Sequence, residues 1–475
     1  MINMTEASID QANFGLEYAQ QNNVQYAEAR LIDGTRTVFV LQNGNILSGS
    51  TLPWQGIGFR VLVNGGLAFI SVDDIFNRKA IKKAIDTGIK MARTSNPKEK
   101  IDFGETISNV AKWGIPTEEK ISDVTTDRML ELLVEMDKVA ESQNISTRAN
   151  IFEAQESNKY IVTSEGTQIH ASLSMLKFIG ILTAKGLLDS EQKMIDLTRS
   201  TGWEGTKTWL KEYENHCTRI AKVAAQSDHK LTGKIDFVVG PEVVGIICHE
   251  NCGHPSEGDR IKGREGAQAG ESFWRDLKLG ESRVGSEHVT ILEDPTILGT
   301  GGYYLYDDEG VQARERVLIK EGVINEPLLN REFGVKFGMA SNAAARSADF
   351  NREPIIRMAN TYMKPGNFTS DELIEDISSG IYMLSFTEWN IDDRRYQSKY
   401  VGFECYEIQN GEITETMVRR PVMELTSIGL FSSIDGVPKD LSFDFPGICG
   451  KSDPGQGVPV HAGGGMIRMR GIRLG

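Results

Sequence analysis

The sequence predicts an α+β protein of several domains, in which N-terminal and middle α+β units precede a β-rich C-terminal domain. The chain has 475 residues, too many for one ordinary hydrophobic core. Helical and strand-like patterns alternate over the first half, whereas strand-like runs and glycine-rich turns dominate the second half. We therefore expect three domains, at residues 1–110, 111–230 and 231–475.

The N-terminal unit is expected to open with a helix and to continue with strands. Residues 5–21 place apolar side chains broadly on one side of a helix, with Thr5 as its cap. Two hairpins should follow, turning at Asn43 and at Asn64, because each asparagine precedes a glycine and this pair suits a tight turn. Residues 73–96 then carry isoleucines and alanines at helical spacing.

The middle unit shows the same order of helix and then strands. Residues 125–143 predict a helix, and residues 147–186 predict strands with a turn at 164–167. A further helix over 203–228 closes this unit. Residue identity between the first two units is too weak to indicate a repeat.

The C-terminal domain is expected to start with a strand that leads into a short helix. Pro241 suits the first turn of that helix, which then carries a run of valines and isoleucines. Two histidines come at its end, so the C-terminal domain should carry a metal-binding helix. One more helix is expected at 369–380.

The bulk composition excludes several classes of protein. A formal net charge of −14 disfavours a nucleic-acid-binding surface, which would need basic patches. Five cysteines without a pattern suggest no disulfide framework and fit a reducing cytoplasm. No apolar run is long enough for a membrane helix, and the N-terminus has no signal-peptide pattern. We therefore expect a cytoplasmic protein without a membrane partner.

The stretch CHENCGHPSEG, residues 248–258, concentrates metal-binding and acid–base groups. A catalytic zinc takes three protein ligands and keeps one position open. His249 and His254 would supply two of these ligands. Glu250, next to the first histidine, is then placed to take a proton from a water molecule.

The five-residue spacing of the two histidines does not fit a regular α-helix. Five residues turn a helix by roughly 500°, which leaves the second histidine about 140° from the first. One extra residue in the turn, a π-bulge, would return it towards the same face. Gly253 makes such a distortion easy, and Pro255 favours an end to the helix there.

The residues alone leave the third ligand open. The candidates are Glu257, Asp259, His288, Cys449 and His461. Cys449 lies between two glycines, which would let backbone approach closely and the thiolate project. Cys248 and Cys252 flank the motif, but a small buried hydrophobic residue is the better interpretation of each.

Other polar and aromatic groups could support the site, although a solvated loop or ordinary packing explains each of them as well. The candidate supporting acids and donors are Asp307, Asp308, Glu309, Tyr303, Tyr304 and His288. The segment RMANTYMKPG, residues 357–366, would either line a peptide groove with strand edges or form an ordinary strand.

Four separated motifs together resemble the TldD/PmbA family. HENCGHPSEGDRIKG is similar to its metal motif, His-Glu-x-x-x-His with an acidic tail. Three later segments match further family motifs in the expected order: YYLYDDEGVQARERVLIKEGV, RMANTYMKPG and GICGKSDPGQGVPV. The resemblance covers nearly the whole chain and is most specific in residues 231–475.

The resemblance implies a zinc metallopeptidase of the TldD type, because the PmbA (TldE) type lacks the metal motif. Carried over by position, the zinc ligands would be His249, His254 and Cys449, and the catalytic base would be Glu250. The implied substrates are unfolded or short peptides. The implied assembly is a homodimer or a heterodimer with a metal-free PmbA/TldE-like subunit.

A non-catalytic interaction or modulator protein with a structural zinc is the alternative. Structural zinc sites close with four protein ligands, whereas three are expected here, which favours catalysis. The family's older connection with DNA gyrase suggests a nucleic-acid factor, but the acidic charge disfavours it. The basic run at 466–475 is better explained as a strand with alternating arginines.

Overall fold

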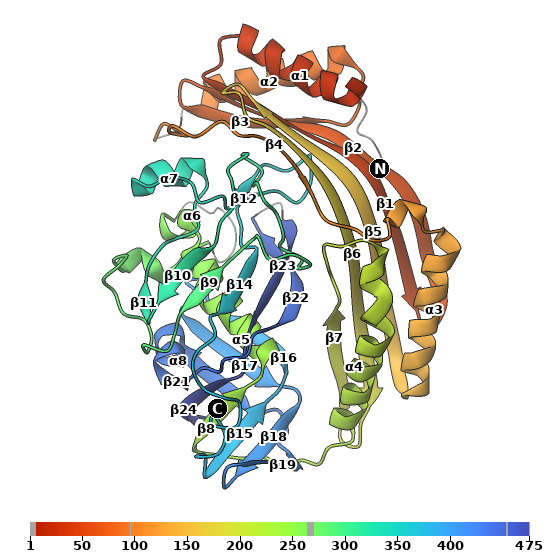
Figure 1. Ribbon diagram of the computed structural model, residues 1–475, viewed down its shortest axis with the longest axis vertical. Coiled ribbons are helices and arrows are strands. Elements are labelled where there is room, and N and C mark those ends of the chain that lie inside the picture. The colour runs from red at the N-terminus through yellow and green to blue at the C-terminus, as the bar shows by residue number, and fades with distance from the viewer. Residues whose placement is uncertain (1–5, 96, 98, 264–269, 453–454, 475) are drawn as a thin grey trace.

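The computed structural model describes residues 6–95, 97, 99–263, 270–452 and 455–474. A long curved sheet arches along one side of a C-terminal half that is built from several smaller sheets (Figure 1). The expected α+β class and the strand-rich C-terminal half are confirmed. In the described part of the chain, no helix combines the length and the apolar character needed to cross a membrane.

Strands from the first and second predicted units form one seven-stranded sheet. Its order is β3-β2-β1-β5-β6-β4, with β7 also beside β6, and only β4 runs parallel to its neighbour. The strands are β1 (Tyr26–Gln42), β2 (Asn45–Val63), β3 (Gly66–Val72), β4 (Val110–Gly114), β5 (Ile145–Thr163), β6 (Gln168–Lys185) and β7 (Ser190–Asp196). The expected boundary after residue 110 falls inside β4, and the three-domain division stays a prediction.

The two hairpins expected from the asparagine-glycine pairs are present, and they share one strand. Asn43 and Gly44 have φ of 48° and 75°, and Asn64 and Gly65 have φ of 53° and 81°. These positive values are the ones that two-residue hairpin turns require. The sequence predicts two separate hairpins, whereas β2 runs without a break from the first turn to the second.

Four helices cover one face of this sheet. Alternate residues near both ends of β1 belong to the two hydrophobic clusters under the helices, because strand side chains alternate between faces: Ala27, Ala29 and Leu31 in one cluster, Phe39 and Leu41 in the other. The helices are α1 (Glu6–Gln21), α2 (Arg78–Ser95), α3 (Thr126–Ser142) and α4 (Trp209–Ala224), with short 3-10 turns at Ile121–Asp123 and Trp203–Thr208. All four were expected; Thr5 and Asn96, at the edges of two predicted helices, lie outside the described residues. The other face of the sheet is left for the C-terminal half.

Two six-stranded sheets dominate the C-terminal half. The first has the order β11-β10-β9-β14-β23-β22: β9 (Ile291–Glu293), β10 (Arg316–Lys320), β11 (Val323–Ile324), β14 (Asn360–Met363), β22 (Ser442–Lys451) and β23 (Gln456–Gly464). The second has the order β19-β18-β15-β8-β24-β21: β8 (Lys234–Val239), β15 (Ser379–Met383), β18 (Cys405–Gln409), β19 (Glu412–Met417), β21 (Ile434–Gly436) and β24 (Ile467–Arg473).

Smaller elements complete this half. A three-stranded sheet consists of β16 (Phe386–Ile391), β17 (Gln397–Gly402) and β20 (Val422–Thr426), and a two-stranded one of β12 (Ala345–Arg346) and β13 (Ile355–Ile356). The helices are α5 (Pro241–Cys248), α6 (Gly258–Ile261), α7 (Arg331–Phe337) and α8 (Ser427–Ser433), with 3-10 turns at His254–Ser256 and Phe273–Asp276.

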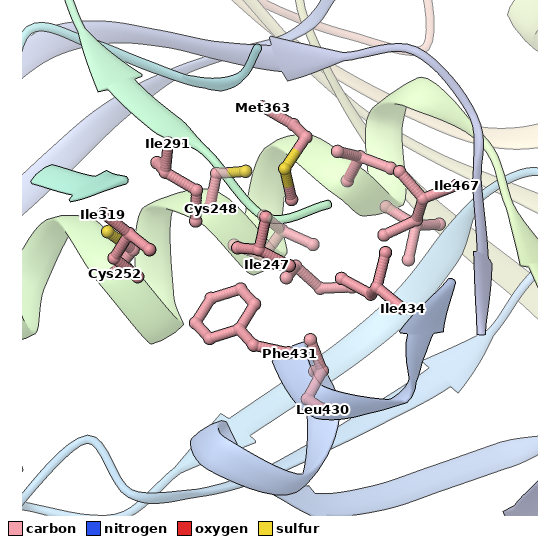
Figure 2. Close-up of a cluster of buried hydrophobic side chains, with 14 of the residues drawn as sticks. Ile247, Cys248, Cys252, Ile291, Ile319, Met363, Leu430, Phe431, Ile434 and Ile467 are labelled. Carbon is pink, nitrogen blue, oxygen red and sulfur yellow. The ribbon is translucent and has the colours of Figure 1, made fainter. Parts of the chain in front are cut away.

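The core of the C-terminal half surrounds α5. Figure 2 shows Ile247, Cys248 and Cys252 among apolar side chains such as Met363 and Phe431. The same cluster includes residues of both six-stranded sheets, so α5 is fixed between them. Cys248 and Cys252 are fully buried, and burial raises the pKa of both thiols, as expected for small hydrophobic residues.

The helix expected at 369–380 is absent, and the prediction was wrong. Residues 370–376 form consecutive turns instead. The segment is fixed at both ends, because Phe368 bridges to Pro438 and β15 begins at Ser379. The carbonyls of Ile377 and Ser378 accept from the amides of Gly411 and Asn410, so tertiary pairing holds the end of the predicted helix outside a helical conformation.

Within the basic run at 466–475, Ile467–Arg473 form β24, as preferred from the sequence. Arg468 contacts the carboxylates of Asp376 and Asp435, each at 2.8 Å. Arg470 also pairs with Asp236 at 2.8 Å. These arginines are therefore neutralised within the fold, which argues against a nucleic-acid-binding patch at this strand.

Candidate metal centre

The helix that carries the histidines starts where β8 ends. Gly240 is extended, and Pro241 follows in the first helical turn, where its fixed φ and missing N–H are tolerated. The helix then buries Val243, Val244 and Ile247 completely. This apolar contact fixes the direction of α5 and hence the place where the motif begins.

The expected π-bulge is present. α5 continues into a π turn at His249–Gly253 and then into the 3-10 turn that begins at His254. The imidazole rings of the two histidines consequently lie with centroids 4.9 Å apart, at 82° to each other. A Cβ at Gly253 would overlap the sulfur of Met358, so the turn requires glycine at this position.

Cys449 joins the two histidines from a distant part of the chain. It lies on β22, which packs with β23 against α5. β22 approaches α5 closely, because a Cβ on Gly245 of α5 would lie 2.6 Å from Cβ of Phe445 on β22. The Cys449 Sγ lies 3.4 Å from Nε2 of His254. One ligand atom from each of the three residues falls within 4.8 Å of the others, and all three side chains are buried.

The other four candidates for the third ligand lie elsewhere or have other partners. Asp259 pairs with Lys451 at 2.7 Å. His288 is exposed. His461 is buried and donates from Nε2 to the Phe443 carbonyl at 2.9 Å. The fourth, Glu257, contacts a ligand rather than acting as one.

Glu257 orients His254. Its Oε2 accepts a hydrogen bond from Nδ1 of His254 at 3.0 Å, which leaves Nε2 of the ring facing Cys449. Arg260 Nε and Lys451 Nζ lie 2.7 Å and 3.3 Å from the same carboxylate oxygen. Burial alone would raise the pKa of Glu257, but Lys451, His254 and Arg260 hold it well below its usual value. The His254 imidazole therefore faces the ionised Glu257 carboxylate, which is held in place.

The electrostatics of two of the ligands, Cys449 and His249, favour the protonation states that metals bind. Burial raises the pKa of Cys449, but the nearby charges of His254 and Arg357 outweigh this and lower it to about 7. Burial lowers the pKa of His249, which favours the neutral imidazole. A thiolate and neutral imidazoles are the forms in which these side chains ligate metals.

The donor set fits zinc. Two imidazole nitrogens and one thiolate are ligands that zinc accepts, and three protein ligands leave a position open. The buried acid behind His254 is the usual partner of a zinc-bound histidine. The residues present therefore match the cofactor that the sequence predicts.

Glu250 is held by two side chains that the sequence did not reveal. Its Oε2 lies 2.6 Å from Nη1 of Arg395, and its Oε1 accepts a hydrogen bond from Nε1 of Trp389 at 3.1 Å. These residues are 145 and 139 positions away, so no local spacing could have indicated them. Burial raises the pKa of Glu250, but His254, Arg395 and His249 lower it below its ordinary value.

The expected supporting acids lie instead at the junction with the long sheet. Asp308 pairs with Lys159 of β5 at 2.7 Å, and Glu309 pairs with Arg60 of β2 at 2.9 Å. Asp307 accepts hydrogen bonds from three backbone amides, those of Glu309, Val311 and Ala345. Asp308 and Glu309 therefore connect the two halves of the molecule, whereas Asp307 orders the loop that carries them.

The expected supporting tyrosines also have other partners. The Tyr304 hydroxyl donates to the Ala343 carbonyl at 2.7 Å. The Tyr303 ring packs edge-on against Trp113 of β4, with centroids 5.9 Å apart. Both contacts are the ordinary packing that the sequence allowed.

The segment at 357–366 is not the edge of a groove. Its strand, β14, pairs with β9 on one side and with β23 on the other. Both sets of backbone groups are thus used within the sheet, so no peptide can add to this strand. The interpretation as an ordinary strand is correct.

A cavity lies on the opposite side of the β22–β23 hairpin from the metal-ligating side chains. It has a volume of about 530 Å³ and is lined by Ile448, next to Cys449, and by residues of the long sheet such as Arg36 and Lys177. None of the three ligands lines it. The metal centre and this cavity therefore share a wall.

Comparison with family models and known proteins places the chain in one family. Residues 232–475 match the PmbA/TldA metallopeptidase C-terminal domain, and residues 27–92 match the PmbA/TldA metallopeptidase domain 1. A metalloprotease of Methanocaldococcus jannaschii is 31% identical, with 93% of this chain and 95% of the relative covered.

Two further relatives agree. A zinc metalloprotease TldD homolog of Saccharolobus solfataricus is 31% identical over 51% of this chain and 52% of the relative. TldE from Thermococcus kodakarensis has the same fold, with a TM-score of 0.73 at 15% identity over 98% of this chain and 99% of that structure. The family models and the full-length similarity to a metalloprotease show that the chain belongs to the PmbA/TldD metallopeptidase family.

Proposed function

We propose that the chain is a zinc-dependent peptidase that hydrolyses unfolded or short peptides, with Glu250 as its general base. The main support is the buried group of His249, His254 and Cys449, with the carboxylate of Glu250 directly after His249 on the π turn. Similarity to relatives named metalloprotease supports the same reaction class.

Three ligands favour a catalytic centre over a structural one. A structural zinc is normally held by four protein ligands, whereas the described residues bring together three. When bound, zinc would supply a Lewis acid that polarises the peptide carbonyl and makes a nearby water more acidic.

The chain's own residues would hold the ligand geometry and move one proton. Glu250 takes a proton from the attacking water while the water oxygen bonds to the carbonyl carbon of the peptide. The same proton then passes from Glu250 to the amide nitrogen as the C–N bond breaks. One water is consumed, and a carboxylic acid and an amine are released.

The proposal includes the cellular environment of the protein and its assembly with a second subunit. All five cysteines are buried free thiols, which is compatible with a reducing cytoplasm. The likeness to TldE supports an active form that pairs this chain with a metal-free subunit of that type, or with a second copy of itself.

Mass spectrometry of unstructured peptides after incubation with the purified protein tests the proposal. The wild type should cleave them, and a Glu250→Ala variant with the same zinc content should not. Each protein is tested alone and with an added metal-free family subunit. Absence of cleavage by the wild type under both conditions would contradict the peptidase and favour an interaction protein with a structural zinc.

A further inference from the structure

We infer that Arg395 and Trp389 are positioning residues that fix the orientation of the Glu250 carboxylate. The inference rests on the proposed function, because it concerns the base of that reaction. It assigns a role to the β16–β17 hairpin, which contributes no metal ligand.

Each of the two contacts holds a different oxygen of the Glu250 carboxylate. Arg395 Nη1 lies 2.6 Å from Oε2, and Trp389 Nε1 donates to Oε1 at 3.1 Å. A carboxylate held at both oxygens cannot rotate about its terminal bond without breaking one of these contacts. Each oxygen keeps a lone pair for a water molecule, because a carboxylate offers about four acceptor sites.

The ion pair is shielded from solvent. The Arg395 and Glu250 side chains are 12% and 7% exposed. Screening by water is therefore weak, unlike in the surface pairs that contribute little. The Trp389 ring is fixed in turn by Phe386, with centroids 5.7 Å apart at 88°.

The loop that carries Arg395 is built to hold one conformation. Arg395 has a φ of +59°, which is unfavourable for a residue other than glycine. Asp392 Oδ1 accepts hydrogen bonds from the amides of Tyr396 and Gln397, at 2.6 and 3.1 Å. The Ser427 hydroxyl of α8 donates to the Arg395 carbonyl at 2.8 Å. Such an unfavourable backbone persists where its surroundings over-determine it, which is common at functional sites.

The same loop is also tied to the π turn by the residue after Glu250. Asn251 Nδ2 donates to the hydroxyls of Ser398 on β17 and Ser427 on α8, at 3.1 and 2.8 Å. The Tyr400 hydroxyl of β17 donates to Asn251 Oδ1. The hairpin and the π turn therefore move as one unit, and the relative positions of Arg395 and Glu250 are fixed by backbone as well as side chains.

A base works only when its lone pair faces the proton it removes, and a displacement of about 1 Å can cost about 100-fold in rate. Loss of either contact would let the Glu250 side chain rotate while leaving the metal ligands in place. The effect should therefore appear in kcat, with KM and zinc content unchanged.

Steady-state peptide hydrolysis by four variants of the full chain tests this inference. Arg395→Ala should lower kcat about 100-fold, Arg395→Lys should restore part of it, and Trp389→Phe should lower kcat while keeping the ring packed on Phe386. Arg394→Ala is the matched control, since the neighbouring Arg394 pairs with Asp276 instead of Glu250. Added guanidinium ion should partly restore the kcat of Arg395→Ala, because the ion can occupy the space left by the removed side chain.

Equal losses in Arg394→Ala and Arg395→Ala would overturn the inference. So would a higher KM at unchanged kcat, which would assign Arg395 to substrate binding instead. A second measurement is independent of activity: the indole N–H resonance of Trp389 should move upfield in Glu250→Gln, whose amide oxygen is a weaker acceptor. An unchanged resonance would overturn the contact itself, whereas an inactive wild type with a shifted resonance would contradict only the peptidase function.

Discussion

At the scale of single residues, Glu257 shows how this centre is prepared for a metal. One oxygen of its buried carboxylate contacts His254, Arg260 and Lys451. Two cations keep the acid ionised, so it can accept from the imidazole and direct the other ring nitrogen towards Cys449. An acid seven residues from the base thus has an orienting role rather than a ligating one.

Glu257→Gln should weaken zinc binding by about 10- to 100-fold, because an amide orients the histidine less strongly than a carboxylate. Competition with a chromophoric chelator measures this affinity. Asp259→Asn is the control, since Asp259 shares Lys451 with Glu257 but has no contact with His254. Equal losses in the two variants would point to Lys451 instead of His254 as the cause.

His461 gives the fold a predictable response to pH. Burial lowers its pKa to about 4, against an opposing hydrogen bond to the Phe443 carbonyl. The unfolded chain binds this proton below pH 6.5 and the folded chain only near pH 4, so stability should fall as pH decreases through this window. The loss should not exceed about 3.4 kcal/mol, at 1.36 kcal/mol per pKa unit.

Urea unfolding of the wild type and of His461→Gln between pH 7 and pH 4 measures this contribution. The variant should show a smaller loss of stability across the same range, because its side chain does not titrate. Parallel curves for the two proteins would show that other groups cause the acid sensitivity.

At the scale of elements, the features predicted correctly from the sequence are those that neighbouring residues determine. The asparagine-glycine turns and the five-residue histidine spacing each have a local cause, and the hairpins and the π turn are present as expected. The predicted helix at 369–380 failed because its ends are fixed by Phe368 and β15. The contacts of Glu250 with Arg395 and Trp389 could not be predicted, because only tertiary packing brings them together.

The π turn itself can be tested at Gly253. Gly253→Ala should destabilise the fold and reduce zinc affinity, because the added methyl group would overlap the sulfur of Met358 and displace His254. We expect a loss of about 1–3 kcal/mol, the usual cost of overpacking. Thermal unfolding and zinc titration measure the two effects.

A double variant, Gly253→Ala with Met358→Ala, tests whether the overlap with the Met358 sulfur is the cause. Removal of the sulfur should restore much of the zinc affinity if the overlap is the cause. Failure of this rescue would show that the overlap with Met358 is not the cause, since Gly253 has an ordinary helical backbone with φ of −56°.

At the scale of the whole molecule, buried ion pairs join the long sheet to the C-terminal half. Arg60 of β2 contacts Glu28 of β1 and Glu309, at 2.7 and 2.9 Å. Arg30 and Lys159 reach Asp308 from the same sheet. The pairs with Glu309 and Asp308 cross between segments that were expected to be separate domains, so the halves should unfold together.

Arg60→Met should destabilise the molecule by about 3–5 kcal/mol, because it leaves two buried carboxylates without their shared cation. Arg36→Met is the control, since Arg36 pairs with Glu153 at a partly exposed position and should cost about 1 kcal/mol or less. Urea unfolding followed by fluorescence measures both. Two separate transitions in the wild type would contradict coupled unfolding of the halves.

The 195 positions that separate His254 from Cys449 have a kinetic consequence. The two histidines come from one local turn, which can form early, but the thiolate arrives only when β22 docks on α5. Long-range pairing of this kind is slow, because chain entropy is lost before the contact forms. Tight zinc uptake should therefore mark the end of folding, and a zinc-sensitive dye would time the completion of the C-terminal half during refolding.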